Sequence, residues 1–147
     1  MIRPATLDDL PLLRDCAVQA FSGYRLDMGQ DPAPMHADYA ALVEAGDVHV
    51  IETGDGSFQG FIAYHAEAGA MHLDIVALLP EAAGQGLGRK LIEHCEKAAR
   101  EEGLQTVKLY TNVKMEGNLT LYPRLGYAET ARKSEDGFDR VYFEKRL

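Results

Sequence analysis

The sequence has no tryptophan and only two cysteines among its 147 residues. Cys16 and Cys95 lie far apart in predicted helices, so we expect buried, reduced thiols rather than a disulfide framework. No apolar run reaches the roughly 18 residues that a membrane span needs, and no charged-then-apolar signal begins the chain. These absences give no support to secretion or membrane insertion, so we expect a cytoplasmic protein with no membrane partner.

Basic residues are also scarce, since 15 Lys and Arg stand against 23 Asp and Glu, for a net charge of −8. Nucleic-acid binding needs a basic surface, so no nucleic-acid partner is expected. Apolar residues make up 46% and charged residues 26%, which is typical of globular proteins and excludes disordered or collagen-like classes. The length suits one domain, residues 1–147, with a single core.

One stretch, residues 73–95, carries the strongest functional pattern. An apolar strand leads through Pro80 to three glycines at alternate positions, Gly84, Gly86 and Gly88, and then to an amphipathic helix. Glycines let backbone N–H groups approach an anion, and the helix dipole places a positive end beside them. The stretch is therefore predicted to hold a phosphate group.

Three common classes of binding site contain such a turn, and the spacing of their residues distinguishes them. A P-loop needs GxxxxGK[ST], but Lys90 is not followed by Ser or Thr. A dinucleotide-binding turn needs GxGxxG after an N-terminal strand, whereas this chain has GxGxG more than halfway along. Residues 83–88, AGQGLG, approached by Leu-Leu-Pro at 78–80, resemble the acyl-CoA loop of the GNAT family of N-acetyltransferases.

Hydrophobic periodicity and turn residues divide the whole chain into helices and strands. Short turns predict antiparallel hairpins, whereas the helix between strands 70–79 and 106–111 makes that pair parallel. The fold class is α/β (α+β), a mixed, mostly antiparallel central sheet of about seven strands with helices on both faces. This element order is similar to that of the GNAT family across its full length. The expected elements are strand 2–5, helix 8–22, loop 23–34, helix 35–45, strands 48–53, 58–67 and 70–79, helix 86–102, strand 106–111, helix 115–124, and strands 127–133 and 138–146.

The resemblance implies acetyl-CoA as co-substrate, no metal, and a gap between the fourth and fifth strands that admits the pantetheine arm. The Arg or Gln of the family's loop falls at Ala83, so Gln85, Arg89 or Lys90 would have to supply any side-chain contact to the phosphates. A backbone N–H of Leu78 or Leu79 is expected at the thioester carbonyl. The implied acyl-CoA-binding residues are Leu78, Leu79, Ala83, Gly84, Gln85, Gly86, Leu87, Gly88, Arg89 and Asn118.

The acid is expected near the C-terminal end of helix 115–124. Residues 118–127, NLTLYPRLGY, resemble the family's closing motif, which implies that Tyr122 protonates the departing thiolate. A phenol, with an ordinary pKa of about 10, suits this role, and a tyrosine that only packs is the alternative. An Asn often found seven positions before this tyrosine is replaced by Met115, so Asn118 or Asn112 is expected to contact the CoA arm.

The base is expected on strand 70–79, because the acceptor's ammonium must lose a proton. Asp74 and His72 are the candidates, with Glu52 and Glu67 behind them, and solvated polar positions are the alternative for each. His65 could face His72 across the hairpin, which makes a metal site with Asp74 a weaker alternative. Strict alternation places two sets of residues on opposite faces: His72, Asp74 and Val76, and Met71, Leu73, Ile75 and Ala77.

The acceptor is the least defined partner. The resemblance implies that loop 23–34 walls its site, with Tyr24, Arg25, Asp27 and Met28 facing it, whereas an ordinary exposed connection is the alternative. The acidic composition suits a cationic amine, either a small molecule or a peptide N-terminus. The departures from the family pattern leave a non-catalytic acyl-CoA-binding or sensing module as an alternative function. The family's closing strands often meet a partner subunit, which makes a homodimer a further expectation.

Overall fold

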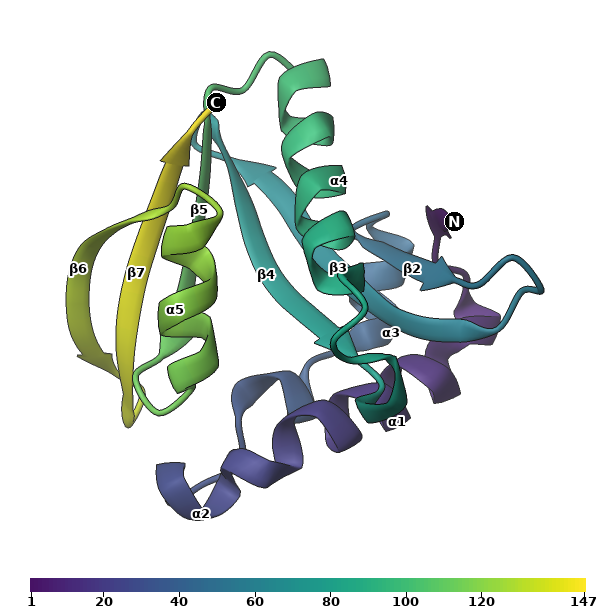
Figure 1. The fold of residues 1–147 in the computed structure, drawn as a ribbon, viewed down its shortest axis with the longest axis horizontal. Coiled ribbons are helices and arrows are strands. Elements are labelled where there is room, and N and C mark those ends of the chain that lie inside the picture. Colours follow the sequence, from purple (N-terminus) through teal and green to yellow (C-terminus); the bar gives the residue numbers. More distant parts are fainter.

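A computed structural model describes all residues, 1–147, and is built around one seven-stranded sheet (Figure 1). The order across the sheet is β1-β2-β3-β4-β5-β7-β6, and β4 and β5 are the only parallel neighbours. The predicted mixed, mostly antiparallel sheet is confirmed. The strands are β1 (Ile2–Pro4), β2 (Val48–Glu52), β3 (Phe58–Glu67), β4 (Ala70–Leu78), β5 (Thr106–Asn112), β6 (Ala128–Glu135) and β7 (Phe138–Arg146).

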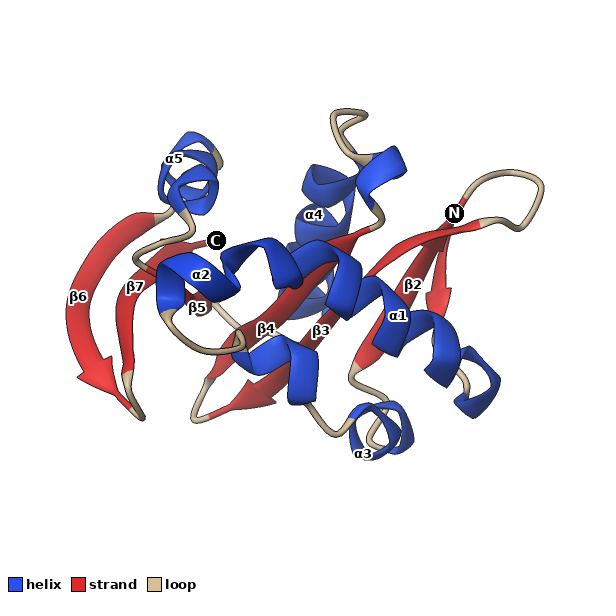
Figure 2. Cartoon of the chain, turned by 90° about the horizontal axis from the view of Figure 1, so that it is seen from below, coloured by secondary structure: helices blue, strands red, loops and turns tan.

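Helices cover both faces of this sheet, as predicted. Figure 2 shows α4 and α5 on one side of the strands and α1 and α3 on the other. All of these helices are too short or too polar to cross a lipid bilayer. The helices are α1 (Leu10–Phe21), α2 (Arg25–Met28), α3 (Tyr39–Glu44), α4 (Leu87–Glu101) and α5 (Glu116–Arg124).

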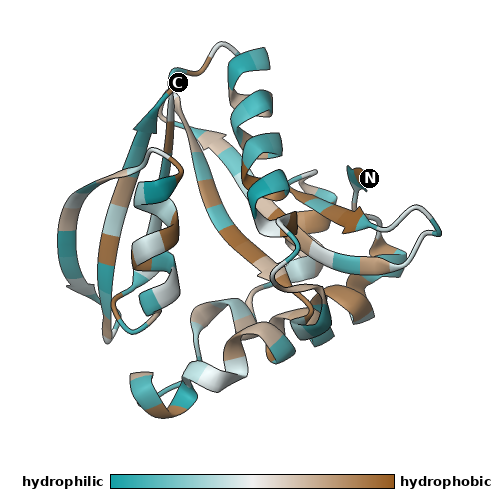
Figure 3. Ribbon diagram, in the orientation of Figure 1, coloured by the Kyte–Doolittle hydropathy of each residue, from teal (hydrophilic) through white to brown (hydrophobic).

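The sheet divides the buried apolar residues into two cores, one on each face, whereas the length of the chain predicted a single core. Helix α4 buries Leu91, Cys95 and Ala99 against the sheet and turns a hydrophilic side outward (Figure 3). Helix α1 buries Leu13 and Cys16 on the opposite face. Both cysteines are free, and burial raises the pKa of each thiol to about 12, so neither is a ready nucleophile.

A buried charge joins α4 to the C-terminal strands. Glu96 is 5% exposed, and its carboxylate accepts hydrogen bonds from the Lys145 ammonium at 3.1 Å and the Tyr127 hydroxyl at 2.8 Å. A carboxylate removed from water is costly unless it is paired in this way. The contact fixes the position of α4 relative to β7.

The segment between α1 and β2 differs from prediction. Residues 23–34 were expected to form a loop, but a 3₁₀ turn (Ser22–Tyr24) and the short α2 continue the helical path of α1. The predicted helix 35–45 is divided into a 3₁₀ turn (Ala33–His36) and α3, because Ala37 is extended. Asp38 then caps α3 by accepting a hydrogen bond from the Ala41 N–H.

The strict alternation predicted for β4 is wrong, because the strand contains a β-bulge. Ala63 pairs with Ile75 and Tyr64 pairs with Leu73, which leaves Asp74 without a partner on β3. The extra residue reverses the faces beyond it. Met71, Leu73, Val76 and Leu78 therefore pack on the α4 side, and Ile75 and Ala77 pack on the α1 side.

Candidate active site

The glycine-rich turn precedes α4 and presents unpaired backbone donors. Gly84 and Gly86 have φ angles of 79° and 77°, a region that side chains with a Cβ rarely adopt. The backbone N–H groups of residues 84–89 have no hydrogen-bond partner in the chain, and intrahelical bonding begins with the Lys90 N–H, which donates to the Gly86 carbonyl. A run of free N–H groups at the N-terminus of a 15-residue helix is suited to an anion.

The side chains around this turn are exposed and partly engaged. Arg89 pairs with Glu93 at 2.8 Å, and Gln85 donates to the Glu81 carbonyl at 3.4 Å. Ala83 is exposed and has no polar group. The backbone is therefore the main source of fixed hydrogen-bond donors at this turn.

Gly88 differs from Gly84 and Gly86, because its φ is ordinary. A Cβ added to it would lie 3.7 Å from the Leu78 side chain.

Strands β4 and β5 pair only at one end. Their ladder is limited to Met71 with Val107 and His72 with Lys108, at the start of both strands. This end lies beside the C-terminus of the chain, and the two strands move apart as they run away from it (Figure 1). The Leu79 N–H donates to the Gln59 carbonyl at 2.9 Å, so it is already used. Since bonding directions alternate along an antiparallel strand, Val76 and Leu78 direct their N–H groups away from β3, toward β5. The gap thus exposes an unpaired strand edge inside the sheet.

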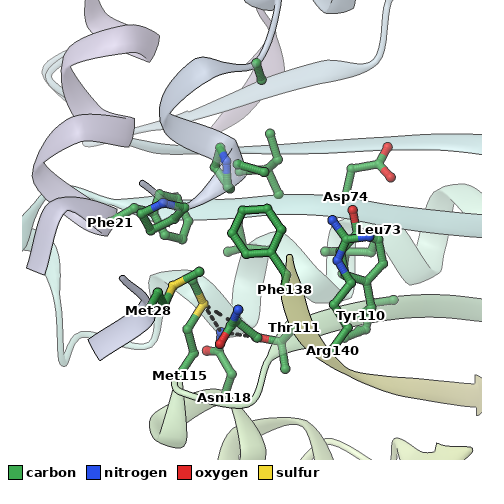
Figure 4. Close-up of a pocket in the computed structure, with 18 of the residues that line it drawn as sticks. Phe21, Met28, Leu73, Asp74, Tyr110, Thr111, Met115, Asn118, Phe138 and Arg140 are labelled. Atoms are coloured by element: carbon green, nitrogen blue, oxygen red, sulfur yellow. Dashed lines mark hydrogen bonds between the residues drawn. The ribbon is translucent and has the colours of Figure 1, made fainter. Parts of the chain in front are cut away.

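A cavity of about 280 Å³ adjoins this gap (Figure 4). Asp74 and Arg140 are the two charged side chains among its 20 lining residues, of which 13 are hydrophobic. The lining residues are Phe21, Met28, Pro32, Ala33, Pro34, Ala37, Leu42, Leu73, Asp74, Ile75, Val76, Leu109, Tyr110, Thr111, Asn112, Met115, Asn118, Tyr122, Phe138 and Arg140.

Tyr122 reaches the cavity from α5. The residue is 6% exposed, and its ring packs against Tyr127 at 5.6 Å and Phe143 at 5.9 Å between centroids. Its hydroxyl has no hydrogen-bond partner in the chain, yet the residue lines the cavity. Burial raises the pKa of this phenol above its ordinary value. Tyr122 therefore stays protonated and can donate a proton to a group in the cavity.

Asn118 also faces the cavity, in a small polar cluster with β5. Its amide donates to the Thr111 hydroxyl at 3.0 Å and contacts the Met115 sulfur at 3.7 Å. Figure 4 shows the side chains of Thr111, Met115 and Asn118 close together, with dashed lines between them. Asn112 lines the same cavity, and its side-chain oxygen accepts a hydrogen bond from the Lys114 N–H.

Asp74, placed in the bulge of β4, pairs with a histidine on β3. The His65 Nδ1 lies 2.6 Å from the Asp74 carboxylate, and its Nε2 lies 3.0 Å from Glu67. The Asp74 side chain is 34% exposed but lies in a concave wall, and burial raises its pKa although the His65 hydrogen bond opposes the shift. Burial lowers the pKa of His65, but its bonds to Glu67 and Asp74 outweigh that effect and raise it.

Most of the other residues predicted for the base and for the acceptor site do not line the cavity. His72 stacks on His65 with ring centroids 5.3 Å apart, as the hairpin predicted, but it does not line the cavity. Glu52 is bound to Arg3 on the far edge of the sheet. Of the four residues expected to face the acceptor, only Met28 lines the cavity, together with Phe21 of α1.

Two polar residues of this region were not predicted as site residues. Sequence reasoning considered His65 only as a metal ligand and overlooked Arg140 altogether. The signal for Arg140 was weak, because a single arginine in a closing strand, FDRVYF, does not differ from a surface position. Only the sheet order, which places β7 beside β5, brings it to the cavity.

Comparison with known proteins agrees with this geometry. Residues 12–127 match the model of the acetyltransferase (GNAT) family, so the chain belongs to that family. The family's description names its members acetyltransferases. An IAA acetyltransferase of Azospirillum brasilense is 34% identical over 90 residues, which are 60% of this chain and 59% of that protein. The chain thus matches less than two thirds of the length of this relative.

Solved structures share the fold over the full chain. A GCN5-related N-acetyltransferase from Rhodopseudomonas palustris has a TM-score of 0.83 at 19% identity, covering 100% of this chain and 95% of that one. The PaiA N-acetyltransferase of Thermoplasma acidophilum, solved with coenzyme A, has a TM-score of 0.73 at 18% identity and covers 100% and 98%. At these identities the likeness establishes the fold alone.

Proposed function

We propose that this protein is an N-acetyltransferase that moves an acetyl group from acetyl-CoA to a primary amine by direct transfer in a ternary complex. One observation carries the proposal. Tyr122, a protonated donor without a partner, and Asp74, a carboxylate with a raised pKa, line one cavity beside the unpaired edge of β4. An acid and a base in one cavity are what acyl transfer to an ammonium requires.

Backbone groups of the chain hold the donor in this proposal. The free N–H groups of residues 84–89 bind the pyrophosphate, and the exposed edge of β4 bonds the pantetheine arm as an added strand. The N–H groups of Val76 and Leu78 are the available donors toward the thioester oxygen, because the Leu79 N–H is already bonded. Asn118 contributes a side-chain contact to the arm.

Side chains of the cavity move the protons. Asp74 takes a proton from the acceptor's ammonium, and the adjacent His65, with His72 stacked on it, stabilises the carboxylate that does so. The amine nitrogen then bonds to the acetyl carbon as the carbon–sulfur bond breaks. Tyr122 gives its proton to the departing sulfur, and the second proton released by the newly acylated nitrogen restores the Tyr122 phenol. The products are therefore an acetamide and a free thiol.

The test is a screen of amines, polyamines, amino acids and peptides with acetyl-CoA, in which release of free thiol is measured. Saturable, amine-dependent release with a sequential kinetic pattern is expected, since direct transfer needs both substrates bound together. A parallel-line, ping-pong pattern would contradict direct transfer. Tight acetyl-CoA binding with no release across the panel would instead support a non-catalytic acyl-CoA-binding module.

A further inference from the structure

Arg140 is a nearly buried cation without a close anionic partner. Its side chain is 12% exposed and lines the cavity. The nearest carboxylate is Asp136 at 3.7 Å, and that side chain is 84% exposed in the β6–β7 turn. The guanidinium also lies near the hydroxyl of Tyr142, a neutral group that donates to Glu135 and supplies no negative charge of its own. Burial of a charge is costly unless a partner compensates it. An anion bound beside the Arg140 guanidinium would supply that compensation.

Two aromatic rings hold the guanidinium in place. Its carbon lies 4.4 Å from the centre of the Tyr110 ring and 5.4 Å from that of Phe138, and Figure 4 shows the three side chains together. Stacking fixes the guanidinium plane and leaves its N–H edges free to donate. A planar, pre-oriented fork of this kind matches the two oxygens of a carboxylate.

Other arginines of the chain do not share this arrangement. Arg3 pairs with Asp9 at 2.9 Å, Arg25 with Asp31 at 2.7 Å and Arg132 with Glu129 at 3.0 Å. Each of these side chains is also at least 34% exposed. Arg140 combines the greater burial with the weaker pairing. Its position in the cavity therefore points to a ligand rather than to a structural ion pair.

We propose that the acceptor is an amine that also carries a carboxylate, and that Arg140 binds this carboxylate while Asp74 faces the ammonium. Arg140 and Asp74 are the cavity's only charges and have opposite signs, which suits a zwitterion. A phosphate would lack a second cation, because no lysine and no other arginine lines the cavity. The hydrophobic lining suits an apolar or aromatic body, as in an amino acid. The inference deepens the proposed function and rests on it.

The experiment compares matched ligands that differ only at the carboxylate. Binding of L-phenylalanine, L-methionine and L-leucine to the CoA-loaded protein is measured by calorimetry beside their carboxamides and phosphoethanolamine, and thiol release is measured with the same compounds. The acids are expected to bind about 100-fold more tightly than the amides, the cost of leaving a buried charge unpaired. Equal binding of acids and amides, no binding of any acid, or preference for the phosphate would overturn the inference.

Variants then assign the effect to Arg140. Arg140→Gln is expected to weaken acid binding about 100-fold, and Arg140→Lys about tenfold because the charge remains and the fork is lost. The control is Arg132→Gln, an exposed arginine on β6, which should bind the acids as the parent protein does. A change in CoA affinity in Arg140→Gln, with acid binding unchanged, would contradict the assignment. Acid binding without any thiol release would refute the transferase proposal and leave this inference standing.

Discussion

The two ends of the proposed active site, one for the acetyl donor and one for the acceptor, are built in different ways. The donor end consists of consecutive backbone groups at residues 84–89, held by one turn and one helix. The cavity proposed for the acceptor is lined by residues of α1, α2, α3, β4, β5, α5 and β7 and of the segment before α3. A local backbone site depends on glycine spacing, whereas an assembled site depends on how distant elements pack. The two ends should therefore respond differently to substitution.

The largest effect is expected at the acceptor cavity, in Tyr122→Phe. Loss of the hydroxyl removes the proton donor, so kcat should fall about 100- to 1,000-fold, in the range of general acid catalysis. The backbone donors of residues 84–89 are untouched, so the Kd of acetyl-CoA should stay the same. Steady-state kinetics and calorimetry measure the two quantities. An unchanged kcat would remove Tyr122 from the acid role.

The next largest effects are expected for Asp74 and for its histidine partner, His65, and they differ in kind. Asp74→Asn should lower kcat/KM about 100-fold, because the proton acceptor is lost. In His65→Leu the base remains, but the hydrogen bond that lowers the pKa of Asp74 is absent, so that pKa rises. Asp74 acts in its ionised form, so activity is lost as pH falls through its pKa, and the acid limb of the kcat/KM profile should move to higher pH.

The control for this pH shift is His36→Leu. His36 makes a similar pair with Asp31 at 2.7 Å, but its side chain is 69% exposed and does not line the cavity. Its removal should leave the profile where it was. An acid limb that stays in place in His65→Leu would show that another group than Asp74 controls it.

The glycine turn at residues 84–88 could be predicted from sequence because its information is local. Glycine spacing and the helix that follows identified the turn, and the element order gave the sheet and its one parallel pair. Tyr122 lies in a contiguous motif, and the structure places it in the cavity as the resemblance implied. Its chemical role stays a prediction until kinetics test it.

The acceptor cavity could not be predicted in the same way. The bulge at Asp74 is a local irregularity without a Gly or Pro to mark it, and it reversed the faces of Val76 and Ile75. Arg140 follows Asp74 by 66 positions and meets the same cavity only because β7 inserts between β5 and β6. Neither fact follows from periodicity or motif spacing, because both depend on strand register and order.

A glycine substitution tests the backbone character of the donor end. Gly86→Ala places a Cβ at φ 77°, which costs about 1–2 kcal/mol and displaces the N–H groups beside it, so the Kd of acetyl-CoA should rise about tenfold. Gly103→Ala is the matched control, because Gly103 has a φ of 73° at the other end of the same helix. Both variants should lose similar stability in thermal unfolding, but only Gly86→Ala should lose affinity. Equal affinities would mean that the turn does not bind the donor.

The smallest expected effect adds a side chain to the donor end. Ala83 is exposed and extended, with φ −67° and ψ 152°, so an arginine fits there without strain. Ala83→Arg places a cation beside the free N–H groups of residues 84–89 and should lower the Kd of acetyl-CoA about threefold to fivefold, the size of one exposed charge contact. The gain should shrink as salt is raised, because exposed charges are screened. Acceptor binding should not change, since residue 83 lies outside the cavity. A gain that persists in high salt would show that the new contact is not an exposed charge contact. A change in acceptor affinity would show that the two ends are coupled rather than separate.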